Sequence, residues 1–395
     1  MKEKEKKAID WITEHKNIIF FIAVSVFALI IRLYGIKFTD GDMKNFLLPW
    51  YKEIVANGKI KALSHQVGNY NILYQTIIAL MSYLPFRPLY CYKTLSIIFD
   101  YLLAFTAADC ISAWKNTKRF EAAFNCIYAF VLCLPTVFIN SSVWGQCDAM
   151  YTFLILLSVK FLYRQRYLKA FIFFGIALSL KLQTIFFIPF FYAVYLYRKN
   201  FTIAHLFLPF FVLWLSGIPG YLAGRKLTET FEIYISQTVE YPRMWLNFPS
   251  FWMLVGNVFG IMAKPAIIIV IILCGAGFYF ILEDRKKLDT PYTFLNTAVW
   301  FLWTILLFLP SMHERYAYPL DILLLMICFF DKNLIIFSAG SIIISTITTS
   351  DFLFASGKAI QSRAFPISYL LLYIGFTYYI ITNEMKSSGC HMLKE

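Results

Sequence analysis

The stretch NIIFFIAVSVFALIIRLYGIKFTDGDMKNFLLPW, residues 17–50, runs from an apolar segment through a polar loop into an amphipathic segment. Its apolar part, residues 17–34, approaches the roughly 20 residues that a helix needs to cross a bilayer. Asp40 and Asp42 follow at the point where such a helix would leave the lipid. The sequence MKNFLLPWYKEIV after them predicts a helix that lies along the membrane surface and keeps both carboxylates at that level.

The rest of the chain has the composition of a membrane protein. Hydrophobic residues make up 59% of the 395 residues, and charged residues only 15%, against about 25% charged residues in soluble domains. Further apolar runs are long enough to cross a bilayer. These features predict an all-α polytopic membrane protein whose first partner is the lipid bilayer.

The charge of the chain reports its topology. A formal net charge of +13 would suggest a nucleic-acid partner for a soluble protein. Here Lys and Arg lie mainly in short loops between apolar runs, so we expect no nucleic acid. The basic N-terminus MKEKEKKAIDWITEHK places the start of the first helix in the cytoplasm, and no small-residue cleavage site follows it.

The segment YNILYQTIIALMSYLP, residues 70–85, has two interpretations: a short span, or a helix at the membrane surface. If it spans, the basic loop WKNTKRF faces outward. If it lies on the outer surface, that loop and the basic loops YRQRYLK, YRKN and EDRKK all face the cytoplasm. We adopt the second assignment because it satisfies the positive-inside rule for every loop.

This assignment predicts about twelve transmembrane helices, with a range of roughly 10–13, and places both termini in the cytoplasm. The predicted spans are residues 17–34, 94–113, 122–138, 149–162, 170–181, 184–197, 203–221, 263–282, 292–309, 318–330, 334–349 and 366–382. The polar stretches FTDGDMKNFLLPW, NSSVWGQCDAM, GRKLTETFEIYISQTVEYPRMWLNFPSF and PSMHERYAYPL then lie on the outer face. Any chemistry is expected there.

Asp40 and Asp42 are the candidate catalytic pair. A carboxylate beside an apolar surface can take a proton from a hydroxyl or help to hold a metal ion. The alternative is a loop that two acids merely keep hydrated. The amphipathic segment after them favours a function, because it would fix the acids at the membrane surface.

A second group of candidates lies in SMHERYAYP, at the start of a predicted helix. Arg315 with His313 beside it suits a phosphate, because a guanidinium presents a planar fork of donors. Glu314 and Tyr316 complete the cluster, and the alternative is a salt bridge at a helix end among interfacial aromatic residues. Lys181 ends another predicted helix on the outer side, where it must snorkel or pair with a negative group.

Polar residues at other outer positions complete a predicted substrate pocket. They are Trp144, Gln146 and Asp148 in NSSVWGQCDAM, and Tyr70 in GNYNILY. A structural role is an equal alternative for Gln146 and Asp148. Together with the acids and the cations, they describe a pocket that opens to lipid and fits an amphiphile with an anionic head.

Two further acids, Asp100 and Asp109, lie inside a predicted span. A charge is expensive there and is usually paired. A structural partner such as Arg32 explains them as well as a catalytic role does.

An ordered set of motifs extends over about residues 42–325: GDMKNFLLPWYKEIVANGKIKAL, GNYNILY, NSSVWGQCDAMYTFLILL, ALSLKLQTIFFIP and LPSMHERYAYPLDILLL. In this order they resemble the bacterial relatives of the second GPI mannosyltransferase, within the GT-C superfamily of polytopic glycosyltransferases. The resemblance implies a GT-C type fold with amphipathic surface helices in the first outer loop. It also implies a polyprenyl-phosphate-linked sugar donor rather than a nucleotide sugar.

The resemblance also implies roles for individual residues. The family's key acid directly follows Gly and stands seven residues before Pro-Trp, which corresponds to Asp42, with Asp40 as the second acid. Family members often have Lys before Met-His-Glu-Arg, where this chain has Ser311, so one cation is missing from the expected phosphate site.

We expect a single transmembrane domain, residues 1–395. Residues 1–220 form its catalytic core module and include the first outer loop, residues 35–90. The helices of residues 221–395 complete the site.

The expected mechanism uses Asp42 as a general base on an acceptor hydroxyl, which attacks the anomeric carbon in one inverting step. Arg315, His313 and Lys181 stabilise the leaving polyprenyl phosphate. The sugar is mannose or another hexose, and the acceptor is a glycan, a lipid or a protein, on the extracytoplasmic side of the bacterial cytoplasmic membrane. A divalent cation, Mg or Mn, on Asp40 and Asp42 is allowed but not required.

The competing function is a flippase or transporter of lipid-linked saccharides. Such a protein should show charges along a path on both sides of the membrane, and two matched halves. Here the polar residues outside the basic loops gather on one face, and the hydropathy shows no repeat. This pattern favours an enzyme, and a non-catalytic membrane scaffold would not need the outer acids.

Overall fold

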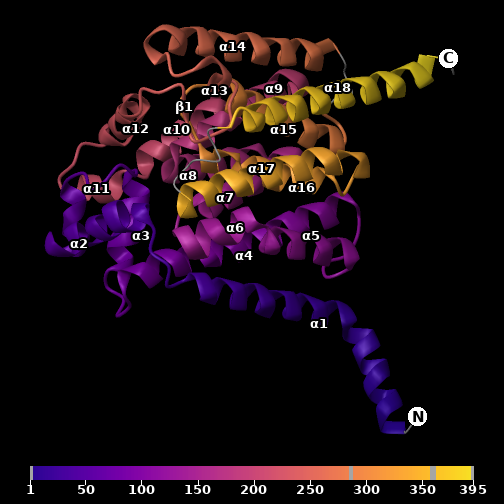
Figure 1. The fold of residues 1–395 in the computed structure, drawn as a ribbon, viewed down its shortest axis with the longest axis horizontal. Coiled ribbons are helices and arrows are strands. Elements are labelled where there is room, and N and C mark those ends of the chain that lie inside the picture. The colour runs from indigo at the N-terminus through magenta and orange to yellow at the C-terminus, as the bar shows by residue number, and fades with distance from the viewer. Residues whose placement is uncertain (1–2, 284–287, 356–361, 393–395) are drawn as a thin grey trace.

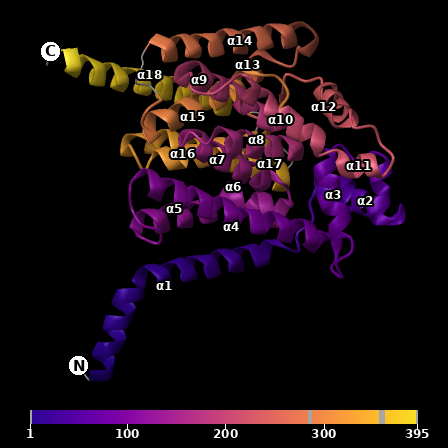
Figure 2. The ribbon, with the colours of Figure 1, turned by 180° about the vertical axis from the view of Figure 1, so that it is seen from behind.

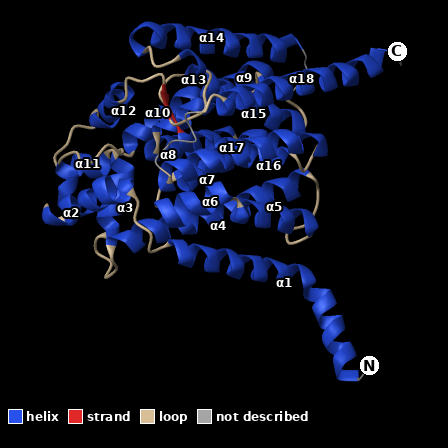
Figure 3. Cartoon of the chain, viewed as in Figure 1, coloured by secondary structure: helices blue, strands red, loops and turns tan. Residues whose placement is uncertain are grey.

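The computed structural model describes residues 3–283, 288–355 and 362–392. Almost all of this chain is helical, and most of the long helices run along one direction in a single bundle (Figures 1 and 3). Two strands of two residues each pair in parallel among the loops. The described chain therefore has the all-α architecture that its composition predicts.

The elements follow one another without a repeated unit. In chain order they are α1 (Glu3–Gly35), η1 (Met43–Leu47), α2 (Leu48–Ala56), η2 (Lys59–Ser64), α3 (Ile72–Met81), α4 (Pro88–Trp114), α5 (Ala122–Cys133), α6 (Pro135–Phe138), η3 (Ile139–Trp144), α7 (Asp148–Tyr163), α8 (Tyr167–Leu180), η4 (Leu182–Phe187), α9 (Ile188–Arg198), α10 (Ala204–Leu215), α11 (Ile218–Leu222), α12 (Glu229–Glu240), β1 (Trp245–Leu246), α13 (Trp252–Val255), α14 (Phe259–Glu283), α15 (Pro291–Phe308), β2 (Met312–His313), η5 (Glu314–Ala317), α16 (Tyr318–Ile327), η6 (Lys332–Leu334), α17 (Ile335–Phe354) and α18 (Ala364–Met392). The turns η1 and η3 are π-helical, and the other η elements are 3₁₀ turns.

Helical segments occupy every stretch that hydropathy predicts to cross the membrane. Within the described residues, seven are long and apolar enough to cross, or eight if the bent pair of α5 with α6 and η3 is one span. Others in the bundle are shorter, such as α16 with 10 residues. The chain is thus a multi-pass membrane protein, and about twelve crossings remain a prediction. The basic loop EDRKK falls, except for Glu283, on residues 284–287, outside the described chain.

Burial separates central helices from lipid-facing ones. In the most apolar 18-residue stretch, 61% of the residues of α4 and 67% of those of α15 are buried, against 11% in α1 and 28% in α14. Accordingly, α1 and α14 lie at opposite edges of the bundle (Figure 1). The exposed side chains of these two helices are mainly large and apolar, so they need lipid rather than water around them.

A proline bends the helix that leads to the end of the bundle opposite the basic loops. Leu134, directly before Pro135, has an extended backbone with φ −60° and ψ 128°, because a residue before proline avoids the helical conformation. The helices before and after this point meet at 52°. The second part ends in η3, which brings Trp144 to that end of the bundle.

The segment assigned to the outer surface forms α3, a helix of 10 residues. It packs with η2, α2 and α11 in a group of short helices beside one end of the bundle (Figures 1 and 2). The position of α3 beside the bundle is what the surface-helix interpretation predicts.

Basic loops meet at the other end of the bundle. Lys115, after α4, donates to the carbonyl of Phe329, after α16, at 2.7 Å. Arg198, at the end of α9, donates to the carbonyls of Leu162 and Tyr163 at 2.7 and 3.2 Å. The start of α1 and the end of α18 lie at this end as well (Figure 1). The described basic loops thus share one end, as the positive-inside assignment requires.

A buried ion pair joins α1 to α4. Arg32 Nε lies 2.8 Å from Asp100 Oδ2, and both side chains are fully buried. Arg32 also donates to the carbonyl of Leu132, and the Ser141 hydroxyl donates to Asp100. Asp100 therefore has a structural role between three helical segments. Asp109 likewise pairs with two basic side chains near the other end of α4.

The variant Asp100→Ala should leave Arg32 as an unpaired buried charge and cost about 3–5 kcal/mol of stability. The double variant Arg32→Met with Asp100→Leu removes both charges and should recover most of that loss. Thermal unfolding of the detergent-purified protein measures both effects. A wild-type melting temperature for Asp100→Ala would show that the pair does not hold α1 against α4.

Candidate functional site

Polar side chains from both halves of the chain meet at the end of the bundle opposite the basic loops. They come from the loop after α1, the loop before α3, the turn between η3 and α7, the end of α8, and the segments around β1 and β2. The parallel pairing of β1 with β2 aligns Leu246 with His313 and joins the last two segments.

Asp42 is the carboxylate that the other groups surround. Its Oδ2 accepts hydrogen bonds from Trp144 Nε1 at 3.0 Å and from Gln146 Nε2 at 3.2 Å. Arg315 Nη1 lies 4.0 Å from the same oxygen. The side chain is 23% exposed, so a substrate group can reach it.

Two π-helical turns place these groups. The turn η1 directly follows Asp42, and η3 ends at Trp144. Such turns are rare and frequently occur at functional sites. Gly145 ends η3 with a left-handed φ of 80°, and a Cβ at this position would lie 2.7 Å from Met43 Cε. Glycine therefore permits the close approach that brings Trp144 to Asp42.

Asp40 faces the backbone. Its Oδ2 accepts the N–H of Asp42 at 2.9 Å, and its Oδ1 accepts the N–H of Met43 at 3.4 Å, which is the arrangement of a helix N-cap. Burial raises the pKa of Asp40 above its usual value, although these backbone hydrogen bonds partly oppose the shift. Of the two predicted catalytic acids, only Asp42 lines a cavity.

The acidic pair offers few open oxygens to a divalent cation. Both oxygens of Asp40 face backbone donors, and Oδ2 of Asp42 faces two side-chain donors, whereas Mg²⁺ or Mn²⁺ needs free oxygen ligands around it. Among the described residues, no group of three His, Cys, Asp or Glu side chains could hold a metal ion. The step proposed below uses only side chains of this chain.

Arg315 lies between the acids. Its Nη1 donates to Glu314 Oε1 at 3.0 Å, and its Nε is 4.0 Å from Asp148 Oδ2. The guanidinium stacks over the ring of Trp144, 4.9 Å from the centroid. Burial alone would lower the pKa of Arg315. The carboxylates of Glu314 and Asp148 outweigh this effect and raise the pKa above its usual value, so the group stays charged. Its Nε is buried and has no hydrogen-bond partner among the described residues.

Asp148 and Lys181 form a buried pair between two helix ends. Asp148 begins α7, and Lys181 directly follows α8. The ammonium of Lys181 contacts Asp148 Oδ1, and Asn140 Nδ2 donates to Oδ2 at 2.8 Å. Asp148 is fully buried and Lys181 is 6% exposed. The prediction that Lys181 pairs with a negative group is confirmed.

His313 is a neutral member of the site. Burial lowers its pKa well below the usual value, and the nearby charges of Arg315 and Lys181 lower it further. The imidazole therefore offers a hydrogen bond rather than the positive charge expected from the sequence. Burial also raises the pKa of Glu314, while Arg315 opposes this shift.

Two cavities meet at Arg315. The larger, of about 350 Å³, has a mainly apolar lining from α8, η4, α12, α14 and the loop before β2, and it includes Lys181. The smaller, of about 140 Å³, includes Asp42 and Gln146. The residues that line both are Asn69, Tyr70, Tyr241, His313 and Arg315.

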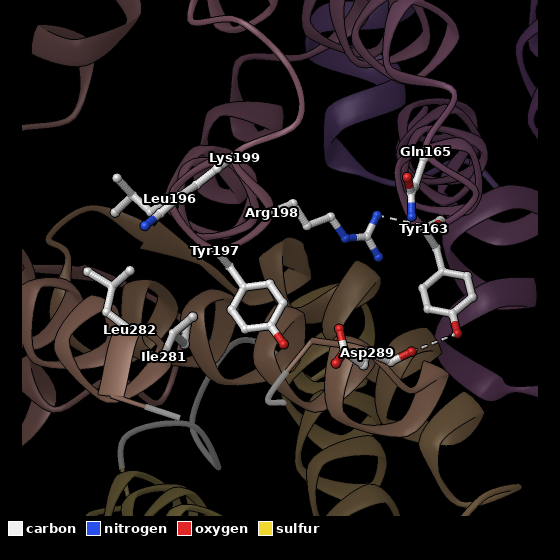
Figure 4. A pocket seen from close by; sticks show the side chains of 9 residues that line it. All are labelled: Tyr163, Gln165, Leu196, Tyr197, Arg198, Lys199, Ile281, Leu282 and Asp289. Atoms are coloured by element: carbon white, nitrogen blue, oxygen red, sulfur yellow. Dashed lines mark hydrogen bonds between the residues drawn. The ribbon is translucent and has the colours of Figure 1, made fainter. Parts of the chain in front are cut away.

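A third cavity, of about 840 Å³, lies at the opposite end, between the ends of α7, α9 and α14 (Figure 4). Two of its polar side chains bond to neighbouring backbone. Arg198 donates to the carbonyls of Leu162 and Tyr163, and the Tyr163 hydroxyl donates to the carbonyl of Asp289 at 3.2 Å. These contacts join helix ends, so we assign no function to this cavity despite its volume.

The structure brings the predicted site residues together but gives them different positions. Those that line one or both of the outer cavities are Asp42, Tyr70, Gln146, Lys181, His313, Arg315 and Tyr316. Those that lie behind the lining and contact it are Asp40, Trp144, Asp148 and Glu314.

Several residues of the site were not singled out from the sequence. Trp50 and Tyr241 line the smaller cavity, Asn140 holds Asp148, and Asn247 donates to the Glu314 carboxylate at 3.5 Å. Neutral amides and aromatic rings are common in membrane proteins and carry no charge signal. Their only indication in the sequence is their place in stretches assigned to the outer face.

No protein-family model matches this chain, and no curated protein matches it. The GT-C resemblance therefore stays an expectation, and the function has to be argued from the site.

Because Asp40 acts as a cap, Asp40→Asn should change the stability by no more than about 0.5 kcal/mol, since asparagine caps helices as well as aspartate does. Asp40→Ala should cost about 1 kcal/mol. Thermal unfolding of the two variants separates them. Equal losses in both would mean that the charge of Asp40, and not its cap, stabilises the loop.

Proposed function

We propose that the protein is a membrane glycosyltransferase of the GT-C type, which transfers a hexose from a polyprenyl-phosphate-linked donor to an acceptor hydroxyl. The observation that carries this proposal is the position of Arg315. The guanidinium lies where two cavities meet, 4.0 Å from both Asp42 and Asp148, with a buried Nε–H that has no partner among the described residues. A site built this way can hold an anionic leaving group beside a general base.

The larger cavity suits the lipid-linked donor. Most of its lining is apolar, including Leu182, Phe186 and Ile267, which matches a polyprenyl chain. Lys181 and Arg315 stand in the same lining, where a phosphate would meet two cations. The Arg315 guanidinium lines this cavity, so it can donate a charge-assisted hydrogen bond to a phosphate oxygen held there.

The proposed step balances without a cofactor. The acceptor oxygen forms a bond to the anomeric carbon as its proton passes to Asp42. The bond between the anomeric carbon and the phosphate oxygen breaks, and its electron pair leaves with the polyprenyl phosphate. Because one displacement occurs, the configuration at the anomeric carbon inverts. Mannose is the sugar that the family resemblance suggests.

Proton transfer to Asp42 would contribute a factor of roughly 10²–10⁴ to the acceleration over the uncatalysed reaction. The rest comes from positioning and from charges that need not move during the reaction. Arg315 is held in place by Glu314 and Trp144, so it can meet the developing phosphate charge without reorganisation.

The distribution of basic loops supports an extracytoplasmic site. The described basic loops share the end of the bundle opposite Asp42 and Arg315. Since Lys and Arg in short loops remain on the cytoplasmic side, the site would face outward from the bacterial cytoplasmic membrane.

A flippase or transporter of lipid-linked saccharides is the alternative. In such proteins, charged groups mark a path through the bilayer. Here Arg32 pairs with Asp100, and Asp109 pairs with Lys160, so these charges inside the bundle neutralise one another. Charged groups line cavities at both ends of the bundle, but the pairing of the charges inside the bundle, between the two ends, favours the enzyme.

The proposal is tested by incubating the purified protein with radiolabelled polyprenyl-phosphate hexoses and candidate acceptors. Wild type should transfer sugar, and Asp42→Asn should lower kcat by roughly 10²-fold or more while donor binding is retained. Asp289→Asn, at the opposite end, is the matched control and should keep full activity. Normal turnover by Asp42→Asn would remove Asp42 from the mechanism, and added chelator should have no effect on wild type.

Cysteine labelling tests the side of the membrane. In intact cells, a variant Gly41→Cys should react with an impermeant maleimide, because Gly41 is exposed beside Asp42. Asn116→Cys, in a basic loop, should not react until the membrane is permeabilised. The reverse pattern would place the site in the cytoplasm.

A further inference from the structure

We infer that Gln146, which Tyr70 holds in turn, is a positioning residue for Asp42. Gln146 donates a hydrogen bond to Oδ2 of Asp42, so that a proton from an acceptor in the smaller cavity passes to Oδ1 of Asp42. This inference rests on the proposed glycosyl transfer. It adds which cavity holds the acceptor, which oxygen of the base reacts, and which residues orient that base.

The first observation is the asymmetry of the Asp42 carboxylate. Trp144 Nε1 and Gln146 Nε2 both donate to Oδ2, and Arg315 approaches this oxygen as well. No hydrogen bond to Oδ1 is formed within residues 3–283, 288–355 and 362–392. Two donors on one oxygen fix the rotation of the carboxylate and leave the other oxygen with its lone pairs available.

The second observation is that Gln146 cannot turn freely. Tyr70 Oη donates to Gln146 Oε1 at 3.1 Å. This hydrogen bond orients the amide so that its nitrogen faces Asp42. The backbone of Gln146 is held on both sides, because its N–H donates to Asn140 at 3.0 Å and its carbonyl accepts from Ser96 at 2.7 Å. A reversed amide would place two oxygens, Oε1 and Asp42 Oδ2, against each other.

The third observation is that Tyr70 itself is held by packing. Its ring contacts Tyr74 at 4.4 Å and the edge of Trp50 at 5.9 Å between centroids. Gly68 lies against the Trp50 ring, where a Cβ would come within 2.4 Å of it. A continuous series of contacts therefore runs from the loop before α3 through Tyr70 and Gln146 to Asp42 and fixes the orientation of its carboxylate.

The cavities then divide between the substrates. Asp42 and Gln146 line the smaller cavity, whereas Lys181 lines the larger one. Arg315 and Tyr70 line both. A donor phosphate at Lys181 and Arg315 would place the anomeric carbon near the shared wall, so the acceptor hydroxyl has to approach from the side of Asp42.

The test uses Gln146→Glu and Tyr70→Phe in the full-length protein. Gln146→Glu puts a second carboxylate beside Asp42, and a neighbouring negative charge disfavours the ionised form of a base. The acidic limb of the pH profile of kcat/KM should therefore move to higher pH. Tyr70→Phe removes one hydrogen bond and should lower kcat about tenfold, with little change in the KM for the donor.

A double-variant cycle separates positioning from direct binding. If Tyr70 acts through Gln146, Tyr70→Phe should have no further effect on kcat in a Gln146→Leu background. Additive losses, or a rise in donor KM at constant kcat, would overturn the inference. Trp114→Phe, which alters an aromatic side chain at the opposite end, is the control and should behave as wild type.

A second measurement does not depend on turnover. A water-soluble carbodiimide with an amine labels protonated carboxyl groups, and mass spectrometry reports the labelling of Asp42 against pH. The labelling profile in Gln146→Glu should move to higher pH than in wild type, and an unchanged profile would overturn the inference. Absence of sugar transfer by wild type, with the labelling shift present, would instead reject the proposed function alone.

Discussion

The arrangement of the site depends on one fully buried carboxylate, Asp148, which has to be neutralised inside a membrane protein. An ionised acid without partners would cost several kcal/mol in such surroundings. Lys181 and Asn140 provide two partners, and Arg315 adds a third charge at 4.0 Å. Because these groups come from the ends of different helices, the requirement to pair Asp148 brings α7, α8, η3 and η5 together at one end of the bundle.

The remaining contacts extend from this centre. Arg315 is braced by Glu314 and by the face of Trp144, and Trp144 donates to Asp42. A cation fixed in this way keeps its geometry when a ligand arrives, which is what electrostatic catalysis requires. The same contacts separate a cavity that contains Asp42 from a cavity that contains Lys181. The two proposed substrates can thus be held apart and still meet at one guanidinium.

The sequence predicted individual helices and helix ends better than it predicted roles. The end of α8 at Lys181, the start of α7 at Asp148 and the short surface helix α3 all lie where apolar runs and charged loops placed them. In contrast, Asp40 and Asp42 look alike in the sequence. Asp40 caps the helix that begins after it, so its oxygens turn to the backbone. Which of two nearby acids becomes the cap depends on where the helix starts, and hydropathy does not define that residue.

By itself, the sequence determined that this chain is a membrane protein, which apolar stretches are helices, and which basic loops share one end of the bundle. These properties follow from the cost of exposing apolar or charged groups to the wrong solvent, and each stretch of the chain pays that cost locally. Only the tertiary structure decided that Asp42, Gln146 and Arg315 meet, that Asp148 lies behind them, and that His313 is neutral. Those properties depend on the order in which helices pack and on the burial that packing produces, and neither is encoded in the hydropathy of any single segment.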